Sequence, residues 1–204
     1  VVLTDMDEVL GTTAGNALEI EESMAYLRNE HRDARLDEVV MALCAEMLLV
    51  SGLQETLEAA IRACDEAVTS GRAAEIFDRM SAALGGPADF SANSSRYLEK
   101  APVVRPVYAD GYLTEVDVRS VGNAIIELGG GRRQVGESLD LSVGFSNIAG
   151  IGALLDGEKP LALVHAASEN AALQAERLLL AACTVGPEAP PSRPVIYEKL
   201  SGDS

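Results

Sequence analysis

Apolar residues in the first hundred positions recur at helical spacing after one short apolar run. Residues 1–4 (Val-Val-Leu-Thr) predict a short strand. Apolar positions spaced three or four residues apart then predict four helices, beginning near residues 16, 36, 53 and 72. Asn16 is expected to cap the first, with Glu19 completing a capping box. The helix over 36–50 is apolar nearly all round, so we expect it to be deeply buried, and the other apolar stripes to pack into a core.

The pattern changes after a stretch rich in Gly, Pro, Ser and Asn over residues 85–101, which we expect to be a linker. Strands are expected at 103–108 and 112–116, joined into a hairpin by an Asp-Gly turn signal at 110–111. Asp117 is expected to cap a helix that ends at glycines 129–131. Further elements are expected as short strands over 143–145, 153–155 and 161–165, a helix from Ser168 to about residue 184, and an edge strand over 195–197.

Composition excludes several classes of protein. The 204 residues carry 16 Lys and Arg against 32 Asp and Glu, a net charge of −16, which disfavours nucleic-acid binding because phosphate contact needs clustered positive charge. No apolar run approaches the ~18 residues that a membrane helix needs. Cys44, Cys64 and Cys183 are odd in number and widely spaced, which argues against a disulfide framework or zinc site and fits a reducing cytoplasm.

Few residues suggest chemistry of their own. His31 lies in a charged stretch and is expected to be solvated, and His165 ends an apolar strand and is expected to be a hydrogen-bonded structural residue. The glycines 129–131, followed by Arg132 and Arg133, could expose backbone N–H groups to a phosphate, but their place at a helix end favours a C-cap.

A weaker signal suggests a cation site. Backbone carbonyls of the turn over residues 10–13, with the carboxylate of Glu22, could form an all-oxygen cage for a hard cation. The alternative is that Glu22 is an ordinary solvated or capping glutamate of a helix.

Several motifs, taken in order, resemble the thymidine phosphorylase and pyrimidine-nucleoside phosphorylase family. Residues 3–11 (LTDMDEVLG) and 14–20 (AGNALEI) are similar to that family's TDMxxPLG…GNALEV stretch. The second half agrees in order and spacing over ADGYLTEVD (109–117), LGGGR (128–132) and GEKPLALVHA (157–166), and the ending PVIYE (194–198) fits the bacterial thymidine phosphorylase branch.

This resemblance implies a fold and an activity. The fold class would be α/β plus α+β: residues 1–100 as the rear, largely helical part of a mixed α/β domain, and residues 101–204 as a small α+β C-terminal domain of short strands and two helices. The parent enzyme would be a pentosyltransferase of nucleoside salvage, converting thymidine and inorganic phosphate to thymine and 2-deoxyribose 1-phosphate. Members of the family are cytoplasmic homodimers, and no membrane or nucleic-acid partner is expected.

The resemblance also implies that the reacting groups lie elsewhere. The family's phosphate loop, of Lys-x-Ser-Thr-Gly-Gly type, and its Arg, Ser and Lys for the pyrimidine precede the TDM block and match no position here. We therefore expect a C-terminal half that is inactive alone, with no catalytic residue and no organic cofactor, in keeping with Val1 standing where a Met would begin a chain.

One functional set carries over by motif position. The family binds a potassium ion near the phosphate loop through two backbone carbonyls and a glutamate, which map to Leu10, Thr13 and Glu22. Thr13 replaces a small apolar residue, which matters little for a carbonyl ligand, and Val9 replaces a proline before Leu10, which would loosen the turn.

Two other functions stay open. The parent could be a broader pyrimidine-nucleoside phosphorylase that also accepts uridine. The chain could instead be a non-catalytic binding module, because Gly157 to Leu161 resembles a turn of lipoyl-type domains. A C-terminal half would lack part of its sheet, so uncovered strand edges and apolar helix faces would favour either association with another chain or a rearranged packing. The resemblance implies a homo-oligomer.

Overall fold

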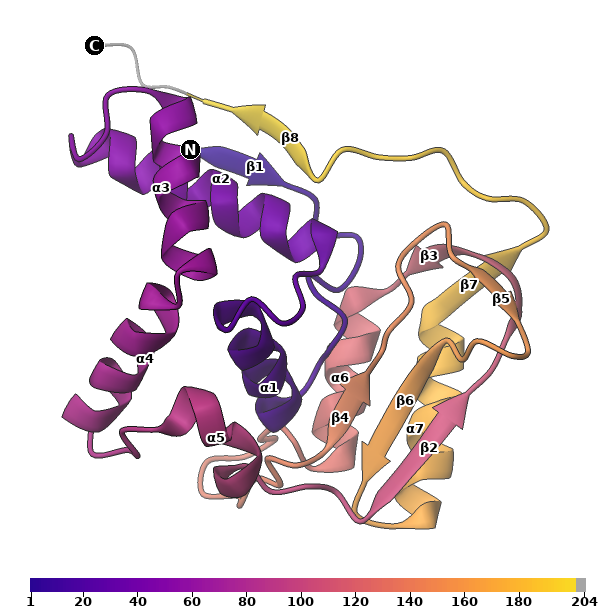
Figure 1. The fold of residues 1–204 in the computed structure, drawn as a ribbon. Coiled ribbons are helices and arrows are strands. Elements are labelled where there is room, and N and C mark those ends of the chain that lie inside the picture. Colours follow the sequence, from indigo (N-terminus) through magenta and orange to yellow (C-terminus); the bar gives the residue numbers. More distant parts are fainter. Residues whose placement is uncertain (201–204) are drawn as a thin grey trace. The chain divides into compact units, whose positions relative to one another are not determined.

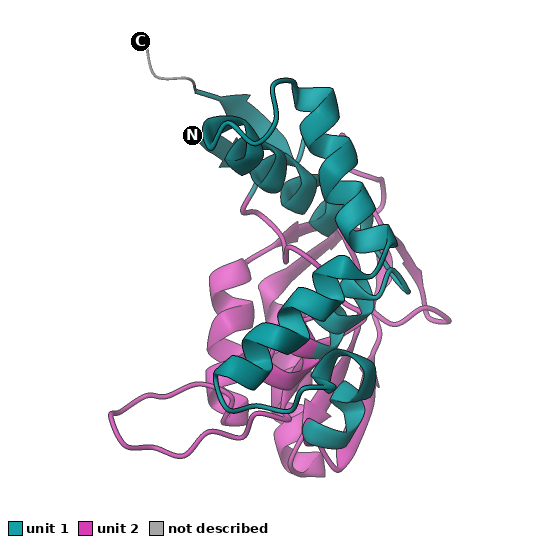
Figure 2. Ribbon diagram, turned by 60° about the vertical axis from the view of Figure 1, so that its left-hand side comes forward, with its two compact units in different colours: residues 1–5, 21–97, 194–204 teal, residues 6–20, 98–193 magenta. Residues whose placement is uncertain are grey.

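A computed structural model describes residues 1–200, and two compact units make up the fold (Figures 1 and 2). Unit 1 contains residues 1–5 and 21–97 with the C-terminal segment from 194, and unit 2 contains residues 6–20 and 98–193. The units are interleaved: the chain leaves one for the other after residues 5, 20, 97 and 193. The expected domains were 1–100 and 101–204; here residues 6–20 group with the second half, β8 (Ile196–Lys199) groups with the first, and residues 201–204 lie outside the described part.

Unit 1 is mainly helical, with one small sheet. Strand β1 (Val2–Thr4) pairs antiparallel with β8, so the expected edge strand is present and its partner is the first strand of the chain. Asp33 and Thr56 cap α2 and α3 by accepting hydrogen bonds from backbone N–H groups of the first turn. The helices are α1 (Asn16–Leu27, which begins in unit 2), α2 (Ala34–Val50), α3 (Leu57–Thr69), α4 (Arg72–Ala83) and α5 (Phe90–Tyr97).

Two expectations for this region are wrong. Only Val39 and Ala45 of α2 are buried, and Val50 is 87 % exposed, so the helix is not deeply buried. Helical spacing identifies an apolar face but not whether another element covers it, and the stripes of α3 and α4 are also largely exposed. The expected linker over 85–101 contains α5, whose aromatic ends Phe90 and Tyr97 stack at 5.8 Å between ring centroids.

Unit 2 combines two three-stranded antiparallel sheets with two helices that pack on each other, which confirms the expected fold class. The sheet orders are β2-β6-β4 and β5-β3-β7. The core is apolar and centred on Phe145, Leu113, Leu155, Leu161 and Leu179, all at most 1 % exposed. The elements are β2 (Val103–Val107), β3 (Asp110–Val116), α6 (Val118–Leu128), β4 (Gly144–Ser146), β5 (Leu154–Asp156), β6 (Ala162–Ala166), α7 (Glu169–Ala182) and β7 (Cys183–Gly186).

The expected hairpin of the second half is wrong. Strand β2 pairs with β6 and strand β3 with β5 and β7, so the two consecutive strands belong to different sheets. The Asp-Gly signal at 110–111 lies inside β3, where Gly111 has a φ of 115°. A turn signal is local, whereas strand partners are chosen by burial of whole faces. The last helix ends at Ala182 rather than near 184, because the chain enters β7 there.

None of the helices among residues 1–200 is long and apolar enough to span a bilayer.

Candidate functional site

The loop between β1 and α1 carries two of the three residues expected at a cation. Leu10 lies at a bend and is 43 % exposed, and none of the hydrogen bonds among residues 1–200 uses its carbonyl. Thr13 is half-buried in the same loop, and Glu22 lies on the second turn of α1. Leu10 and Thr13 belong to unit 2 and Glu22 belongs to unit 1. That all three bind the same cation therefore stays a prediction.

Strand β4 holds this loop through the backbone. The Ala14 N–H donates to the Phe145 carbonyl at 2.9 Å, and the Phe145 N–H donates back to the Ala14 carbonyl at 2.8 Å. Further along, the Ile148 N–H donates to the Thr12 carbonyl at 2.9 Å. Two hydrogen bonds to β4 and one to the segment that follows it, all of good length, therefore fix the register of the loop.

Two glycines bring the backbones into contact at this point. Gly15 and Gly144 have φ of +142° and +147°, a conformation that residues with a side chain rarely adopt. A Cβ at residue 144 would lie 2.3 Å from the Ala14 carbonyl oxygen, and one at residue 15 would lie 2.5 Å from the Val143 carbonyl oxygen. Both positions therefore require glycine. The sequence signal was Gly144 within an expected strand, which is typical of a close backbone approach, but sequence reasoning did not use it.

The ends of the loop are anchored to unit 2 as well. The carboxylate of Glu8 accepts a hydrogen bond from the Ile151 N–H at 2.8 Å. The Asn16 side-chain amide donates to the Gly130 carbonyl at 2.9 Å, so this residue does not cap α1 as expected. Gly15 takes the cap position instead, because its carbonyl accepts the first helical hydrogen bond and its N–H donates to the Glu19 carboxylate at 2.9 Å.

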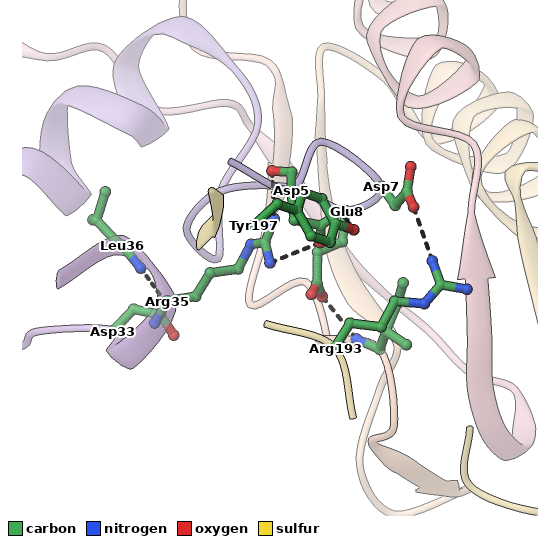
Figure 3. A network of polar contacts seen from close by, with 9 residues as sticks. Asp5, Asp7, Glu8, Asp33, Arg35, Leu36, Arg193 and Tyr197 are labelled. Atoms are coloured by element: carbon green, nitrogen blue, oxygen red, sulfur yellow. Dashed lines mark hydrogen bonds and ion pairs between the residues drawn. The ribbon is translucent and has the colours of Figure 1, made fainter. Parts of the chain in front are cut away.

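A buried ion pair lies directly after β1 in unit 1 (Figure 3). Asp5 is 6 % exposed, and its carboxylate accepts a hydrogen bond from the Arg35 guanidinium at 3.0 Å and one from the Tyr197 hydroxyl at 3.1 Å. Arg35 also donates to the Asp5 carbonyl at 3.0 Å. This network joins β1, the first turn of α2 and β8, and it was not foreseen from sequence.

An exposed ion pair in unit 2 contrasts with it. Arg193 donates to Asp7 at 2.8 Å, and both side chains are more than half exposed (Figure 3). Together with Thr114, Glu115, Val116 and Ile151 they line a polar depression of about 250 Å³. Its two acidic side chains and one arginine make it unsuited to an anionic substrate.

The remaining sequence candidates have structural roles. His165 Nε2 lies 2.8 Å from Ser146 Oγ, which confirms the expected hydrogen bond, and His31 is exposed as expected. Gly129 ends α6 in the left-handed conformation at φ 97°, as expected of a C-cap. Arg133 forms an ion pair with Glu127, which opposes the phosphate interpretation of this loop.

The three cysteines are free thiols. Burial raises the pKa of the Cys183 thiol to about 11, and burial also raises the pKa of Cys64, so neither is tuned toward a reactive thiolate. Within residues 1–200, no three His, Cys, Asp or Glu side chains are grouped so that they could hold a metal ion.

Two family models match the chain. Residues 1–74 match the model described as glycosyl transferase family, a/b domain, and residues 112–186 match the pyrimidine nucleoside phosphorylase C-terminal domain. The first match, on a mixed α/β fold, makes this part of the chain similar to glycosyl-transferring proteins. Because the second match follows in the same chain, the two matches together support a chain that is similar to the thymidine and pyrimidine nucleoside phosphorylases. The resemblance stated from sequence is thereby confirmed.

Proposed function

We propose that this chain is the C-terminal part of a thymidine phosphorylase. The observation that carries the proposal is the succession of the two family matches, an a/b glycosyl transferase domain and then a pyrimidine nucleoside phosphorylase C-terminal domain. The preference for thymidine is supported by the motifs named above, including the PVIYE ending. A broader pyrimidine-nucleoside phosphorylase is the alternative.

The proposed reaction is phosphorolysis of an N-glycosidic bond. A phosphate oxygen bonds to C1′ of the sugar as the bond from C1′ to the pyrimidine nitrogen breaks, and the electron pair of that bond leaves with the base, which is then protonated. Such chemistry depends mainly on positioning and on stabilising the charge that develops on the departing base. Residues 1–204 contain no Lys-x-Ser-Thr-Gly-Gly segment, so we propose that they do not catalyse the reaction alone.

The proposed cofactor is a potassium ion, with no organic cofactor. Backbone carbonyls and a carboxylate are the oxygen donors that hard cations prefer. The Leu10 carbonyl, which no hydrogen bond uses within residues 1–200, fits this role, and Thr13 and Glu22 would supply the others. The ion would supply positive charge beside the phosphate of the complete enzyme.

A phosphorolysis assay tests the function. This chain and the full-length gene product are each incubated with thymidine or uridine in phosphate buffer, and the released base and sugar phosphate are separated chromatographically. We expect thymine and 2-deoxyribose 1-phosphate from the full-length protein, slower release from uridine, and no product from residues 1–204. Product from the isolated chain would contradict its inactivity, and no product from the full-length protein would contradict the function.

We also propose that the chain forms a homo-oligomer in the cytoplasm, in nucleoside salvage. Six large apolar side chains around the turn between α2 and α3 are each at least 40 % exposed, and such a group favours association. They are Leu43, Met47, Val50, Leu53, Leu57 and Ile61, called the α2–α3 apolar surface below. Free thiols support a reducing compartment.

A further inference from the structure

We propose that Cys44 of α2 and Cys64 of α3 form a reversible disulfide when the protein meets a peroxide. Both are free thiols of unit 1, and both are half-buried, so a small oxidant can reach them. The inference is independent of the proposed function, because it involves neither the nucleoside nor the cation.

The first support is the level of the two cysteines along their helices. Helices α2 and α3 follow one another in the chain and pack together as a helical hairpin. Cys44 lies seven residues before Ser51, the C-cap of α2, and Cys64 lies eight residues after Thr56, the N-cap of α3. At a rise of about 1.5 Å per residue, the cysteines lie roughly 10 and 12 Å from the turn, which is almost the same level.

The second support is the side of α3 on which Cys64 lies. Ala60 and Val68, one turn before and one turn after it, are 0 % and 6 % exposed, so Cys64 belongs to the buried face of α3. The buried residue of α2 next to Cys44 is also small, since it is Ala45. Packed helix axes lie about 8–10 Å apart and each Cα lies about 2.3 Å from its axis, so facing Cα atoms come within the roughly 4.4–6.8 Å that a disulfide spans.

The third support is a polar cluster that ties the two helices together. Arg32 donates to Asp37 of α2 at 2.8 Å and to Asp65 of α3 at 2.7 Å. Asp37 lies two turns before Cys44 on the same face of α2, and Asp65 directly follows Cys64. The parts of the helices that carry the cysteines are therefore held together by this cluster at one end and by the turn at the other.

The charge of Cys44 is also felt by the groups around it. Burial, and then the charge of Cys44, raises the pKa of the Cys64 thiol. Burial and the contact with Asp37 raise the pKa of the Tyr26 hydroxyl, and Cys44 adds a smaller effect. Because such interactions weaken with distance, the Cys44 thiol lies near Cys64 and near the Arg32 cluster.

The chemistry takes two steps. The Cys44 thiolate attacks one oxygen of hydrogen peroxide, the O–O bond breaks, and hydroxide leaves as Cys44 becomes a sulfenic acid. Cys64 then loses its proton and attacks the sulfenic sulfur, which forms the S–S bond and displaces a second hydroxide. With the protons taken up by the hydroxides, two thiols and one peroxide give a disulfide and two waters, and two electrons pass from sulfur to oxygen.

The order of the steps follows from the surroundings of Cys64. Its raised pKa makes it a poor first nucleophile. When Cys44 becomes an uncharged sulfenic acid, one of the two causes of that raised pKa disappears, so Cys64 ionises more readily at the moment when its thiolate is needed.

The test maps disulfides in the full-length protein. Native protein is treated with hydrogen peroxide, the remaining thiols are alkylated, and a tryptic digest is analysed by mass spectrometry without reduction. Cleavage after Arg62 separates the two cysteines into peptides 36–62 and 63–72. We expect these peptides to be joined, at a mass lower by two hydrogen atoms than their sum, and to be separated by dithiothreitol.

Three serine variants test the roles of the thiols. Cys183→Ser is the matched control, because this thiol lies in unit 2, and it should leave the linked pair unchanged. Cys44→Ser should abolish the link and leave Cys64 as a thiol that is alkylated. Cys64→Ser should leave a sulfenic acid on Cys44, which dimedone labels.

The mapping of wild-type protein does not depend on the folding of any variant. The inference would be overturned if peroxide-treated protein with native circular dichroism gave peptides 36–62 and 63–72 alkylated separately. A link from either peptide to that of Cys183 in comparable yield, or a link between two copies of peptide 36–62 in place of the expected pair, would also overturn it. Dimedone on Cys64 in the Cys44→Ser variant would contradict the order of the steps.

Discussion

At the scale of single residues, the ion pairs of Asp5 and Asp7 should differ in how much they contribute to the free energy of unfolding. Asp5 is buried against Arg35, whereas Asp7 meets Arg193 in solvent. Removing one partner of a buried pair leaves an uncompensated charge, so Arg35→Ala should lower the free energy of unfolding by about 3–5 kcal/mol. Arg193→Ala removes an exposed pair and should change it by less than about 1 kcal/mol. Urea unfolding followed by circular dichroism measures both.

A double variant checks the cause. Adding Asp5→Asn to Arg35→Ala removes the stranded charge and should recover part of the lost stability. Equal losses in Arg35→Ala and Arg193→Ala, or no recovery in the double variant, would contradict the assignment of the effect to a buried charge.

At this scale, the sequence could predict contacts between residues that lie close together along the chain, but not contacts between distant ones. The cap at Asp117 and the helix start at Ser168 were predicted because the N–H groups that these side chains bind lie three residues away, at Ser120 and Ala171. The contact of Gly15 with Gly144 joins positions 129 apart, and Asp5 meets Tyr197 across 192. No local pattern specifies such partners. The proposed cation ligands were suggested weakly by residue chemistry and more strongly by the motif resemblance.

At the scale of an element, the start of α6 gives a dependence on pH. The Ser120 hydroxyl, and then its backbone N–H, donate to Asp117 and lower the pKa of that carboxyl. Because the folded pKa is depressed, its stabilising effect is fully present above the unfolded value of about 3.9 and is lost as pH falls through the folded value. Acid unfolding should therefore involve release of this cap.

Asp117→Asn isolates the effect, because asparagine caps a helix without titrating. We expect the variant to lose less stability than wild type between pH 5 and pH 2, measured as the change in melting temperature across that range. An identical pH dependence in the two proteins would show that this carboxyl does not contribute.

The positions of the helices were predicted better than the pairing of strands or the burial of helix faces. Helical spacing predicted α1 to α4, α6 and α7, because the recurrence of apolar residues can be recognised within each segment alone. The hairpin of β2 with β3 failed because pairing is settled by the sheet as a whole, where Val103 lies opposite Ala166. The apolar stripe of α2 was expected to pack into a core, but its residues Met47 and Val50 are exposed.

At the scale of the whole molecule, the α2–α3 apolar surface should drive association. We expect residues 1–204 to show about twice the monomer mass of 21.4 kDa by size-exclusion chromatography with light scattering. Met47→Lys combined with Leu53→Lys should give a monomer. Val135→Lys, at an isolated and fully exposed apolar residue, is the control and should behave as wild type. A monomeric wild type would contradict the role of this surface.

The interleaving of the two units bears on how the gene can be cut. A recombinant piece spanning residues 98–193, the larger segment of unit 2, would lack Ala14, which belongs to the core of unit 2, and would leave both hydrogen-bonding groups of Phe145 without the partner they have here. A short synthetic peptide spanning residues 6–20 should restore such a piece when mixed with it, since that segment supplies what the excised part is missing. A single crossover at residue 97 would therefore separate the two segments of unit 2, because residues 6–20 lie far along the chain from residues 98–193.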